Sequence, residues 1–360
     1  MPAQRLIDLH CDWLLQYAGE TTVFDPALYT GVEQRISQSA GYLQATSAAV
    51  LSCYRRAEDW ARQPDPWKAL GELITRLEAE FPGRLLIGPE DFGRWRNEPE
   101  GLCWGIIGVE GFDSLVREPH DLERLPALFD RGVRIFQPVY SENSALAGSS
   151  VRGDSRGLTD LGRAFLQQLA DLPPGPCAAI DIAHMNPTAA SEVLDWFESN
   201  PSCSDRLIPI YSHGALSHDG FNTPRAITRE NIARLRVLGG VIGLSVGPPF
   251  YQSKEAIKVD IEAVAELPYL GRAGFEGIAI GTDFLGVDQT LPGVNDVEAV
   301  VAWIQSAFPP QAAAAILSGN AAALMGRLTC ARVRGQTETE AGSGKVPDIW
   351  LRSTDPQTTA

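Results

Sequence analysis

The stretch CAAIDIAHMNPTAASEVLDWFESNPSCSDRLIPIYSH, residues 177–213, decides the fold class. It begins with one apolar run, Cys177–His184, and ends with another, Leu207–His213. Neither run alternates polar and apolar residues, which is typical of parallel strands buried on both faces. Between them Pro187–Ser199 has helical spacing, and it starts with a proline preceded by Asn186, as capped helices do. The stretch therefore predicts a strand, a helix and a second, parallel strand.

The same alternation continues along the chain in both directions. Eight apolar runs predict strands: Arg5–His10, Ala48–Tyr54, Gly105–Glu110, Val133–Val139, Cys177–His184, Leu207–His213, Gly240–Val246 and Gly277–Asp283. Helical patterns lie between several of them: Asp65–Phe81, Pro119–Arg131, Thr159–Asp171, Pro187–Ser199, Thr228–Leu238 and Lys254–Leu270. This repetition favours an α/β fold of the (β/α)8 TIM-barrel type. An open, doubly wound sheet is the alternative that the pattern alone leaves open.

The chain ends differ from this repeating region. Leu85–Gly88 predicts a peripheral ninth strand, and Ser318–Arg327 predicts a closing helix. We expect one barrel domain over residues 1–334. Residues 335–360 are polar and rich in Gly, Ser and Thr, so they predict a loosely ordered tail.

Composition and charge exclude some classes of function. A formal net charge of −15 argues against nucleic-acid binding, which needs a basic surface. No stretch approaches the ~20 apolar residues of a membrane span. The six cysteines are scattered without a CxxC pair, and the opening residues do not resemble a secretory signal. We therefore expect a cytoplasmic protein with reduced thiols and a small-molecule substrate.

Side chains able to bind metal stand at the ends of several predicted strands. They are His10, Asp12, Glu110, His184, His213 and Asp283. In a barrel the carboxyl ends of all strands open onto one face, where the active site lies. His10 and Asp12 are two apart, so an extended backbone projects them to the same side. The pattern predicts a metal centre of two Zn²⁺ ions, with Glu110 as the bridging carboxylate.

Each of these residues also has an ordinary structural interpretation. A lone histidine at a strand end can be a hydrogen-bonded core residue, and Asp12 can cap a helix. Glu110 can cap the following loop, and Asp283 can form an Asx turn. The joint pattern favours the metal centre. His120 and His218 do not share it, and we expect both at the surface.

Short motifs along the chain resemble the membrane (renal) dipeptidase family, a branch of the amidohydrolase barrels. They occur in the family's order from residue 8 to about 327: DLHCD (8–12), IGVEGF (107–112), IDIAHM (180–185), YSHG (211–214), TPRAIT (223–228), GGVIGL (239–244), GTDFLGV (281–287) and SGNAAALM (318–325). Each motif is short, but together they are specific.

The resemblance implies a role for each matching metal ligand. His10 and Asp12 would hold one zinc ion, and His184 and His213 would hold the other. Glu110 would bridge both ions.

The resemblance also implies substrate-side roles. Asp283 would orient a hydroxide bridging the two ions and handle its proton, and Arg225 would bind a substrate carboxylate. Two positions depart from the family. Tyr140, or Asn143 if the alignment slips, stands where the family has a histidine that polarises the scissile carbonyl. Ala226 stands where the family often has Asn.

Three functions follow from these observations. The first is a binuclear zinc dipeptidase that cleaves small dipeptides, including those with a D-configured C-terminal residue; Tyr140 would bind substrate and assist the oxyanion. The second is a metal-dependent hydrolase of an N-acyl amino acid, lactam, lactone or phosphoester. The third is a catalytically silent binding barrel. A homodimer is a family expectation only.

Overall fold

The computed structural model describes residues 4–18, 20, 24–29, 41–98, 101–140, 144–151, 153–218 and 223–330. The tail expected from residue 335 and the candidate Asn143 lie outside the described residues.

Eight parallel strands close into one barrel in sequence order, which confirms the predicted (β/α)8 fold and excludes the open sheet. The first and last strands pair through Asp8 and Ile280. Each predicted run overlaps one strand: β1 (Leu6–Cys11), β2 (Thr46–Cys53), β3 (Trp104–Glu110), β4 (Val133–Gln137), β5 (Ala178–Asp181), β6 (Leu207–Tyr211), β7 (Val241–Leu244) and β8 (Ile278–Ile280).

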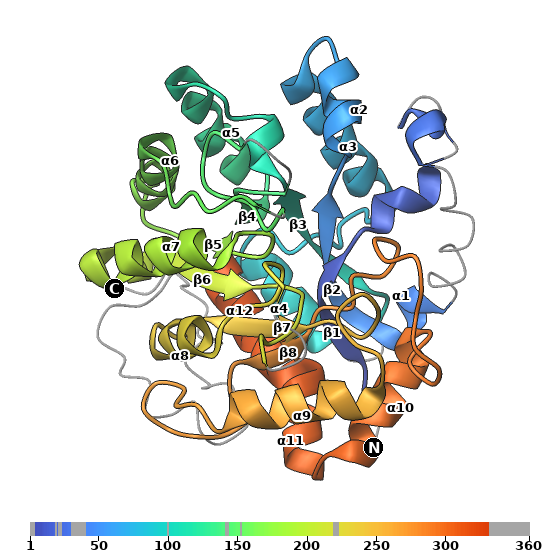
Figure 1. The fold of residues 1–360 in the computed structure, drawn as a ribbon. Coiled ribbons are helices and arrows are strands. Elements are labelled where there is room, and N and C mark those ends of the chain that lie inside the picture. The colour runs from blue at the N-terminus through green and yellow to red at the C-terminus, as the bar shows by residue number, and fades with distance from the viewer. Residues whose placement is uncertain are drawn as a thin grey trace, which may run out of the picture.

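Helices surround the strands in Figure 1. Their bounds are α1 (Tyr42–Ala45), α2 (Ala57–Arg62), α3 (Pro66–Glu80), α4 (Pro89–Asn97), α5 (Leu125–Asp130), α6 (Asp160–Ala170), α7 (Pro187–Ser199), α8 (Arg229–Val237), α9 (Lys254–Ala265), α10 (Val297–Ala307), α11 (Pro310–Ala314) and α12 (Asn320–Thr329). Short 3-10 segments are η1 (Trp13–Tyr17), η2 (Pro26–Leu28), η5 (Phe112–Ser114), η6 (Pro119–Arg124) and η7 (Pro201–Asp205), and a π-helical turn, η8 (Ala315–Gly319), precedes α12. Within the described residues, no helix is long and apolar enough to cross a bilayer.

Two predicted elements differ in the structure. The helix expected over Pro119–Arg131 is divided into η6 and α5, because Pro126 has no N–H to continue an α-helical ladder. The ninth strand expected at Leu85–Gly88 is a single bridge between Leu85 and Gly105, since α4 begins directly after Gly88.

The amino-terminal end of the barrel is covered by α4 and α12. Apolar side chains from all eight strands pack there against those two helices: Ile7, Leu9, Ala48, Val50, Trp104, Ile106, Ile135, Ala179, Ile208, Ile210, Val241 and Ala279 from the strands, with Phe92, Trp95, Leu324, Met325 and Leu328 from the helices. The Cys177 N–H donates to the Arg327 carbonyl (3.0 Å), and Arg134 donates to the Leu328 carbonyl (2.9 Å). The carboxyl ends of the strands lie at the other end of the barrel from α4 and α12.

Candidate metal centre

The six predicted strand-end residues converge at the carboxyl face of the barrel. Each is buried, with under a tenth of its surface exposed: His10, Asp12, Glu110, His184, His213 and Asp283. His10 lies within β1 and Glu110 ends β3. β5 and β6 are shorter than predicted, so His184 and His213 lie in the loops that follow them. His184 has a left-handed backbone (φ 65°), which an extended strand cannot include.

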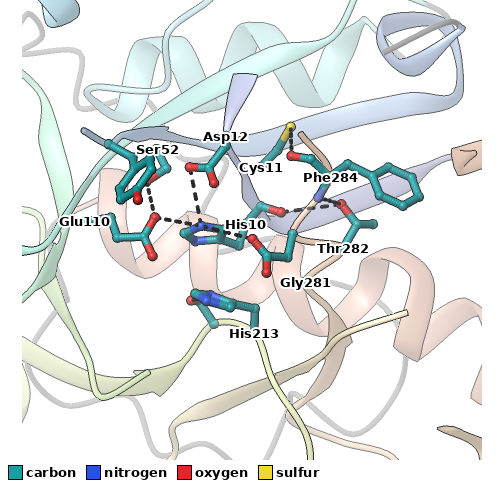
Figure 2. A network of polar contacts seen from close by, with 12 residues as sticks. His10, Cys11, Asp12, Ser52, Glu110, His213, Gly281, Thr282 and Phe284 are labelled. Atoms are coloured by element: carbon teal, nitrogen blue, oxygen red, sulfur yellow. Dashed lines mark hydrogen bonds and ion pairs between the residues drawn. The ribbon is translucent and has the colours of Figure 1, made fainter. Parts of the chain in front are cut away.

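Glu110 lies at the centre of the group. Its Oε2 is 3.2 Å from His10 Nε2, and its Oε1 is 3.1 Å from His184 Nε2. Figure 2 shows the Glu110 carboxylate directed toward the His10 ring. One carboxylate therefore presents a separate oxygen to each of two histidines, which is the arrangement a bridging ligand needs.

The two loop histidines face each other beside Glu110. Nε2 of His184 and Nε2 of His213 are 3.1 Å apart, and the His10 and His213 ring centroids are 4.0 Å apart. The other ring nitrogen of His213, Nδ1, lies 2.8 Å from the Ser212 hydroxyl. That contact fixes the His213 ring with Nε2 directed to the site.

Two further carboxylates lie on the β1 side of the group. Asp12 Oδ1 is 3.8 Å and Asp283 Oδ1 is 4.0 Å from His10 Nε2. Asp12 precedes η1, but its side chain makes no capping hydrogen bond there. Both carboxylates lie close to the backbone of Gly286, and only a glycine leaves room for them there. A Cβ at that position would lie 2.4 Å from Asp12 Oδ2 and from Asp283 Oδ1.

The electrostatics of the group favour positive charge between these residues. Burial lowers the pKa of His10, but the carboxylates of Glu110, Asp12 and Asp283 outweigh it and raise the pKa to about 10. Burial would raise the pKa of Glu110, yet His10 and His184 hold it well below its usual range. Burial and the Glu110 charge raise the pKa of Asp283 to about 6, against the opposing effect of His10.

On the other side of Glu110 the histidines are disposed to be neutral. Burial, followed by the charge of Arg225, lowers the pKa of His184 to about 4. Burial and the neighbouring His10 also lower the pKa of His213 well below its usual range. Neutral imidazoles are the form in which histidine binds metal.

These residues fit a divalent cation: two groups of three donor atoms lie close together, both groups include His10, and neither includes His184. Donor atoms of His10, Glu110 and His213 lie within 4.8 Å of one another, and so do those of His10, Asp12 and Asp283. Among the described residues, His10 Nε2 is a buried nitrogen without a well-directed hydrogen bond. Nitrogen and carboxylate donors of this kind suit zinc.

Asp8 supports the β1 and β8 ends from behind the site. Its Oδ1 accepts the N–H of His10 (3.2 Å) and of Thr282 (2.9 Å), and its Oδ2 accepts the hydroxyls of Thr282 (2.6 Å) and Tyr42 (2.8 Å). Thr282 directly precedes Asp283, which has a left-handed backbone (φ 58°). A backbone of that kind costs about 1–3 kcal/mol, so the surrounding hydrogen bonds must hold it in place.

Asp181 supports the ends of β5 and β6. Its Oδ1 accepts the N–H of Ala183 (3.1 Å) and of Ser212 (3.0 Å). Ala183 and Ser212 directly precede His184 and His213. One buried carboxylate therefore fixes both histidine loops.

Two predicted substrate residues border the metal group. Arg225 is half-buried; its guanidinium donates to the His184 ring and lies 5.2 Å from the Phe250 ring centroid. The Tyr140 ring lies 4.4 Å from the His184 ring, and its hydroxyl is 2.8 Å from the Tyr54 hydroxyl. Both therefore lie where a substrate bound beside His184 would meet them.

The remaining predicted positions are peripheral. His120 and His218 are exposed, as expected. The Cys11 thiol is buried and donates to the Phe284 carbonyl (3.5 Å), so it packs structurally beside the site in Figure 2. Ala226 is buried next to Arg225.

Sequence reasoning did not identify Asp8, Asp181 and Tyr54. Asp8 and Asp181 had a usable signal: each is an acidic residue inside an apolar run, two or three positions before a candidate ligand. Such a residue is buried with the strand and must have hydrogen-bond partners there. Tyr54 had no comparable signal, because tyrosine is common in strands.

Comparisons with known proteins agree with this architecture. The family described as "Membrane dipeptidase (Peptidase family M19)" matches residues 4–327. A Klebsiella pneumoniae protein described as "Uncharacterized protein in pqqA 5'region" is 28% identical over 236 residues, 63% of this chain and 80% of its own length. Dipeptidase tcpJ of Claviceps purpurea is 26% identical over 301 residues, 78% of this chain but only 64% of its own length.

Solved structures share the fold. A structure described as the metallopeptidase "dipeptidase AC" has a TM-score of 0.66 and 18% identity, covering 91% of this chain and 99% of its own. A Rhodobacter sphaeroides metallopeptidase, liganded with a phosphinate mimic of the dipeptide L-Ala-D-Ala, has a TM-score of 0.65 and 17% identity, with the same coverage.

Proposed function

Because the chain belongs to the membrane dipeptidase family, peptidase family M19, we propose that it hydrolyses small dipeptides at a centre of two zinc ions. The observation that carries this proposal is the Glu110 carboxylate, which presents one oxygen to His10 and the other to His184.

Five residues would hold the ions. His10 and Asp12 would bind one, His184 and His213 the other, and Glu110 both. When bound, such ions supply Lewis acidity: they lower the pKa of a water molecule and polarise the carbonyl of the substrate.

The side chains around the ligands have complementary tasks. Arg225 would bind the C-terminal carboxylate of the dipeptide, for which its guanidinium is well shaped. Phe250 supports the guanidinium from one side. Asp283 would accept the proton of the hydrolytic water on Oδ1 and pass it to the amine nitrogen as the C–N bond breaks. Tyr140 would donate its hydroxyl hydrogen to the carbonyl oxygen as negative charge develops there.

The stereochemistry at the C-terminal residue is part of the proposal. The Rhodobacter sphaeroides metallopeptidase of the same fold is liganded with a mimic of L-Ala-D-Ala. A carboxylate held by Arg225 fixes the end of the substrate, so the configuration decides on which side of the C-terminal Cα the side chain lies. L-Ala-D-Ala and L-Ala-L-Ala are therefore the first substrates to compare.

The test is a substrate panel with the zinc-loaded full chain. We expect about two zinc ions per chain and hydrolysis of at least one of the two alanine dipeptides. Glu118→Gln, a change at an exposed carboxylate, serves as the control and should match wild type. Protein that carries two zinc ions but cleaves no dipeptide would contradict the substrate proposal, and protein that binds no zinc would contradict the metal proposal.

A second candidate function rests on Tyr140. A neutral hydroxyl there cannot supply the positive charge of a histidine, so the substrate side of the site departs from the family pattern and other acyl substrates must be compared with dipeptides. The alternative substrates are N-acyl amino acids, lactams and lactones. Faster cleavage of N-acetyl-alanine than of L-Ala-D-Ala would favour this alternative.

Location and assembly are further parts of the proposal. None of the six cysteines forms a disulfide and five are buried, which suits the reducing cytoplasm. Homodimerisation is proposed by family analogy, and size-exclusion chromatography with light scattering tests it.

A further inference from the structure

Two tyrosine hydroxyls meet at the carboxyl face of the barrel. Tyr54 directly follows β2, and Tyr140 follows β4. Their hydroxyl oxygens are 2.8 Å apart and their ring centroids 4.7 Å apart. Tyr54 is only 7% exposed, so its hydroxyl has little access to water.

Contacts with His184, Asp113 and Gly111 fix the position of the Tyr140 ring next to the candidate metal ligands. Its ring lies 4.4 Å from the His184 ring, tilted by 32°. Its backbone N–H donates to Asp113 Oδ2 (3.3 Å), and Gly111 packs so closely that a Cβ there would lie 2.8 Å from Tyr140 Cβ. The ring position is therefore fixed from the main chain.

The hydrogens of the pair do not all have partners. Two hydroxyls carry two hydrogens, and one of them forms the bond from Tyr54 to Tyr140. For the other, carried by Tyr140, no acceptor is found among the described residues. Burial raises the pKa of both phenols, so both remain protonated donors at neutral pH.

We propose that Tyr54 is a positioning residue for the hydrolytic reaction. By donating to the Tyr140 oxygen, Tyr54 occupies a lone pair there and turns the Tyr140 O–H toward the substrate carbonyl. A donor that also accepts a hydrogen bond is polarised and binds a developing oxyanion more strongly. This inference rests on the proposed amide hydrolysis and adds to it the means by which a neutral tyrosine is oriented.

Merely structural packing of Tyr54 makes a different prediction. If Tyr54 only fills space, its hydroxyl has no effect that depends on Tyr140. If it acts through Tyr140, its effect disappears once the Tyr140 hydroxyl is gone. A double-mutant cycle separates the two.

The experiment uses zinc-loaded full chain with Tyr54→Phe, Tyr140→Phe and the double variant. For L-Ala-D-Ala we expect kcat to fall about 10-fold in Tyr54→Phe and about 100-fold in Tyr140→Phe, with KM changed by less than about twofold. The double variant should match Tyr140→Phe alone. The inhibition constant of a phosphinate dipeptide mimic should rise about 10-fold in Tyr54→Phe, because the mimic resembles the tetrahedral intermediate.

Tyr29→Phe is the matched control, since it removes a buried hydroxyl that contacts Asp59 outside the site. It should leave kcat unchanged. Losses that multiply in the double variant, or an unchanged kcat in Tyr54→Phe, would overturn this inference while leaving the dipeptidase proposal intact. A zinc-bound wild type that cleaves no dipeptide would overturn both.

Discussion

Asp8 and Asp181 make equivalent hydrogen bonds on opposite sides of the barrel. Each lies on a strand that carries or precedes a site histidine and accepts the N–H two residues ahead, from His10 (3.2 Å) and from Ala183 (3.1 Å). Each also accepts an N–H from the neighbouring strand end, from Thr282 (2.9 Å) and from Ser212 (3.0 Å). β1 and β5 are four strands apart in a ring of eight, so the two carboxylates brace the centre from both sides.

The Asp181 brace predicts a graded response to substitution. Asp181→Ala removes the acceptor for both amides and should weaken zinc binding about 10–100-fold, as loss of supporting contacts around metal ligands commonly does. Asp181→Asn keeps one side-chain oxygen, and a neutral amide oxygen can still accept both backbone N–H groups. Its zinc affinity should therefore stay within about threefold of wild type. Competition with a chromophoric chelator measures the affinity. Equal affinities for the Ala variant and wild type would show that the brace has no role.

Charge removal at the bridging position should be severe. Glu110→Gln keeps the shape of the side chain but loses the negative charge that would balance two cations. We expect less zinc per chain and a kcat/KM about 1,000-fold lower, equivalent to roughly 4 kcal/mol of transition-state stabilisation. Elemental analysis and steady-state kinetics measure the two effects. A variant that keeps both zinc ions and full activity would exclude Glu110 as the bridge.

Gly286 should tolerate no side chain. A Cβ there would lie 2.4 Å from Asp12 Oδ2 and Asp283 Oδ1, so Gly286→Ala must displace both carboxylates. A shift of that size should lower kcat about 100-fold. Gly93→Ala in α4 is the matched control: a Cβ at that position would have nothing within 4 Å, and activity should be unchanged with stability raised by about 0.5–1 kcal/mol. Equal activity in the two variants would contradict the close approach.

Removing metal should destabilise the whole chain. A ligand that binds only the folded state stabilises it by about 4 kcal/mol at a thousand times its dissociation constant. Chelation should therefore lower the midpoint of thermal unfolding by several degrees, and added zinc should restore it. Differential scanning calorimetry with chelator and with excess zinc checks this. The prediction fails when the two midpoints coincide.

Asp121, at the start of η6, should contribute to the way the free energy of unfolding falls at acid pH. Burial raises the pKa of this carboxyl, but the N–H groups of Arg117 and Glu118 outweigh burial and lower it. A pKa lowered by folding means that the carboxylate stabilises the protein above its unfolded pKa of about 3.9, and that this contribution is lost as pH falls through the lower, folded pKa.

Asp121→Asn should accordingly lower the free energy of unfolding by about 1 kcal/mol at pH 7. The difference from wild type should shrink below about pH 4. Urea unfolding at several pH values measures it. Glu123→Gln, at an exposed position on the same segment, should stay within about 0.5 kcal/mol throughout. A constant difference at all pH values would mean that the cap does not depend on charge.

The barrel could be predicted because its signal is local and repeated. Continuous apolar runs identify strands buried on both faces, and the geometry of a parallel barrel then places every strand end on one face. His10, Glu110 and His213 were found in this way, far apart in sequence but close in space. Helix caps were equally local: Asn186 accepts from the Ala189 N–H (2.8 Å), as its place before Pro187 indicated.

What could not be predicted depends on register and torsion. The braces of Asp8 and Asp181 require knowing which neighbouring amide faces each carboxylate, and β1 contains an irregular register that the sequence does not reveal. The Tyr54–Tyr140 contact depends on two side-chain conformations. The early end of β5 follows from the left-handed backbone at His184, which no pattern of apolar residues encodes.

The contact between β1 and β8 closes the barrel and also positions His10 and Asp283 of the candidate site. Asp8 pairs with Ile280 there, the Asp283 N–H donates to the His10 carbonyl (3.1 Å), and the Asp12 N–H donates to the Phe284 carbonyl (3.0 Å). The Asp8 side chain adds bonds to Thr282. Opening of this contact would break the bond between the Asp283 N–H and the His10 carbonyl and would move His10 away from Asp283. We therefore expect heat to abolish activity at a lower temperature than the one at which the barrel unfolds. Substitutions that strengthen the contact between β1 and β8 should raise the temperature at which activity is lost.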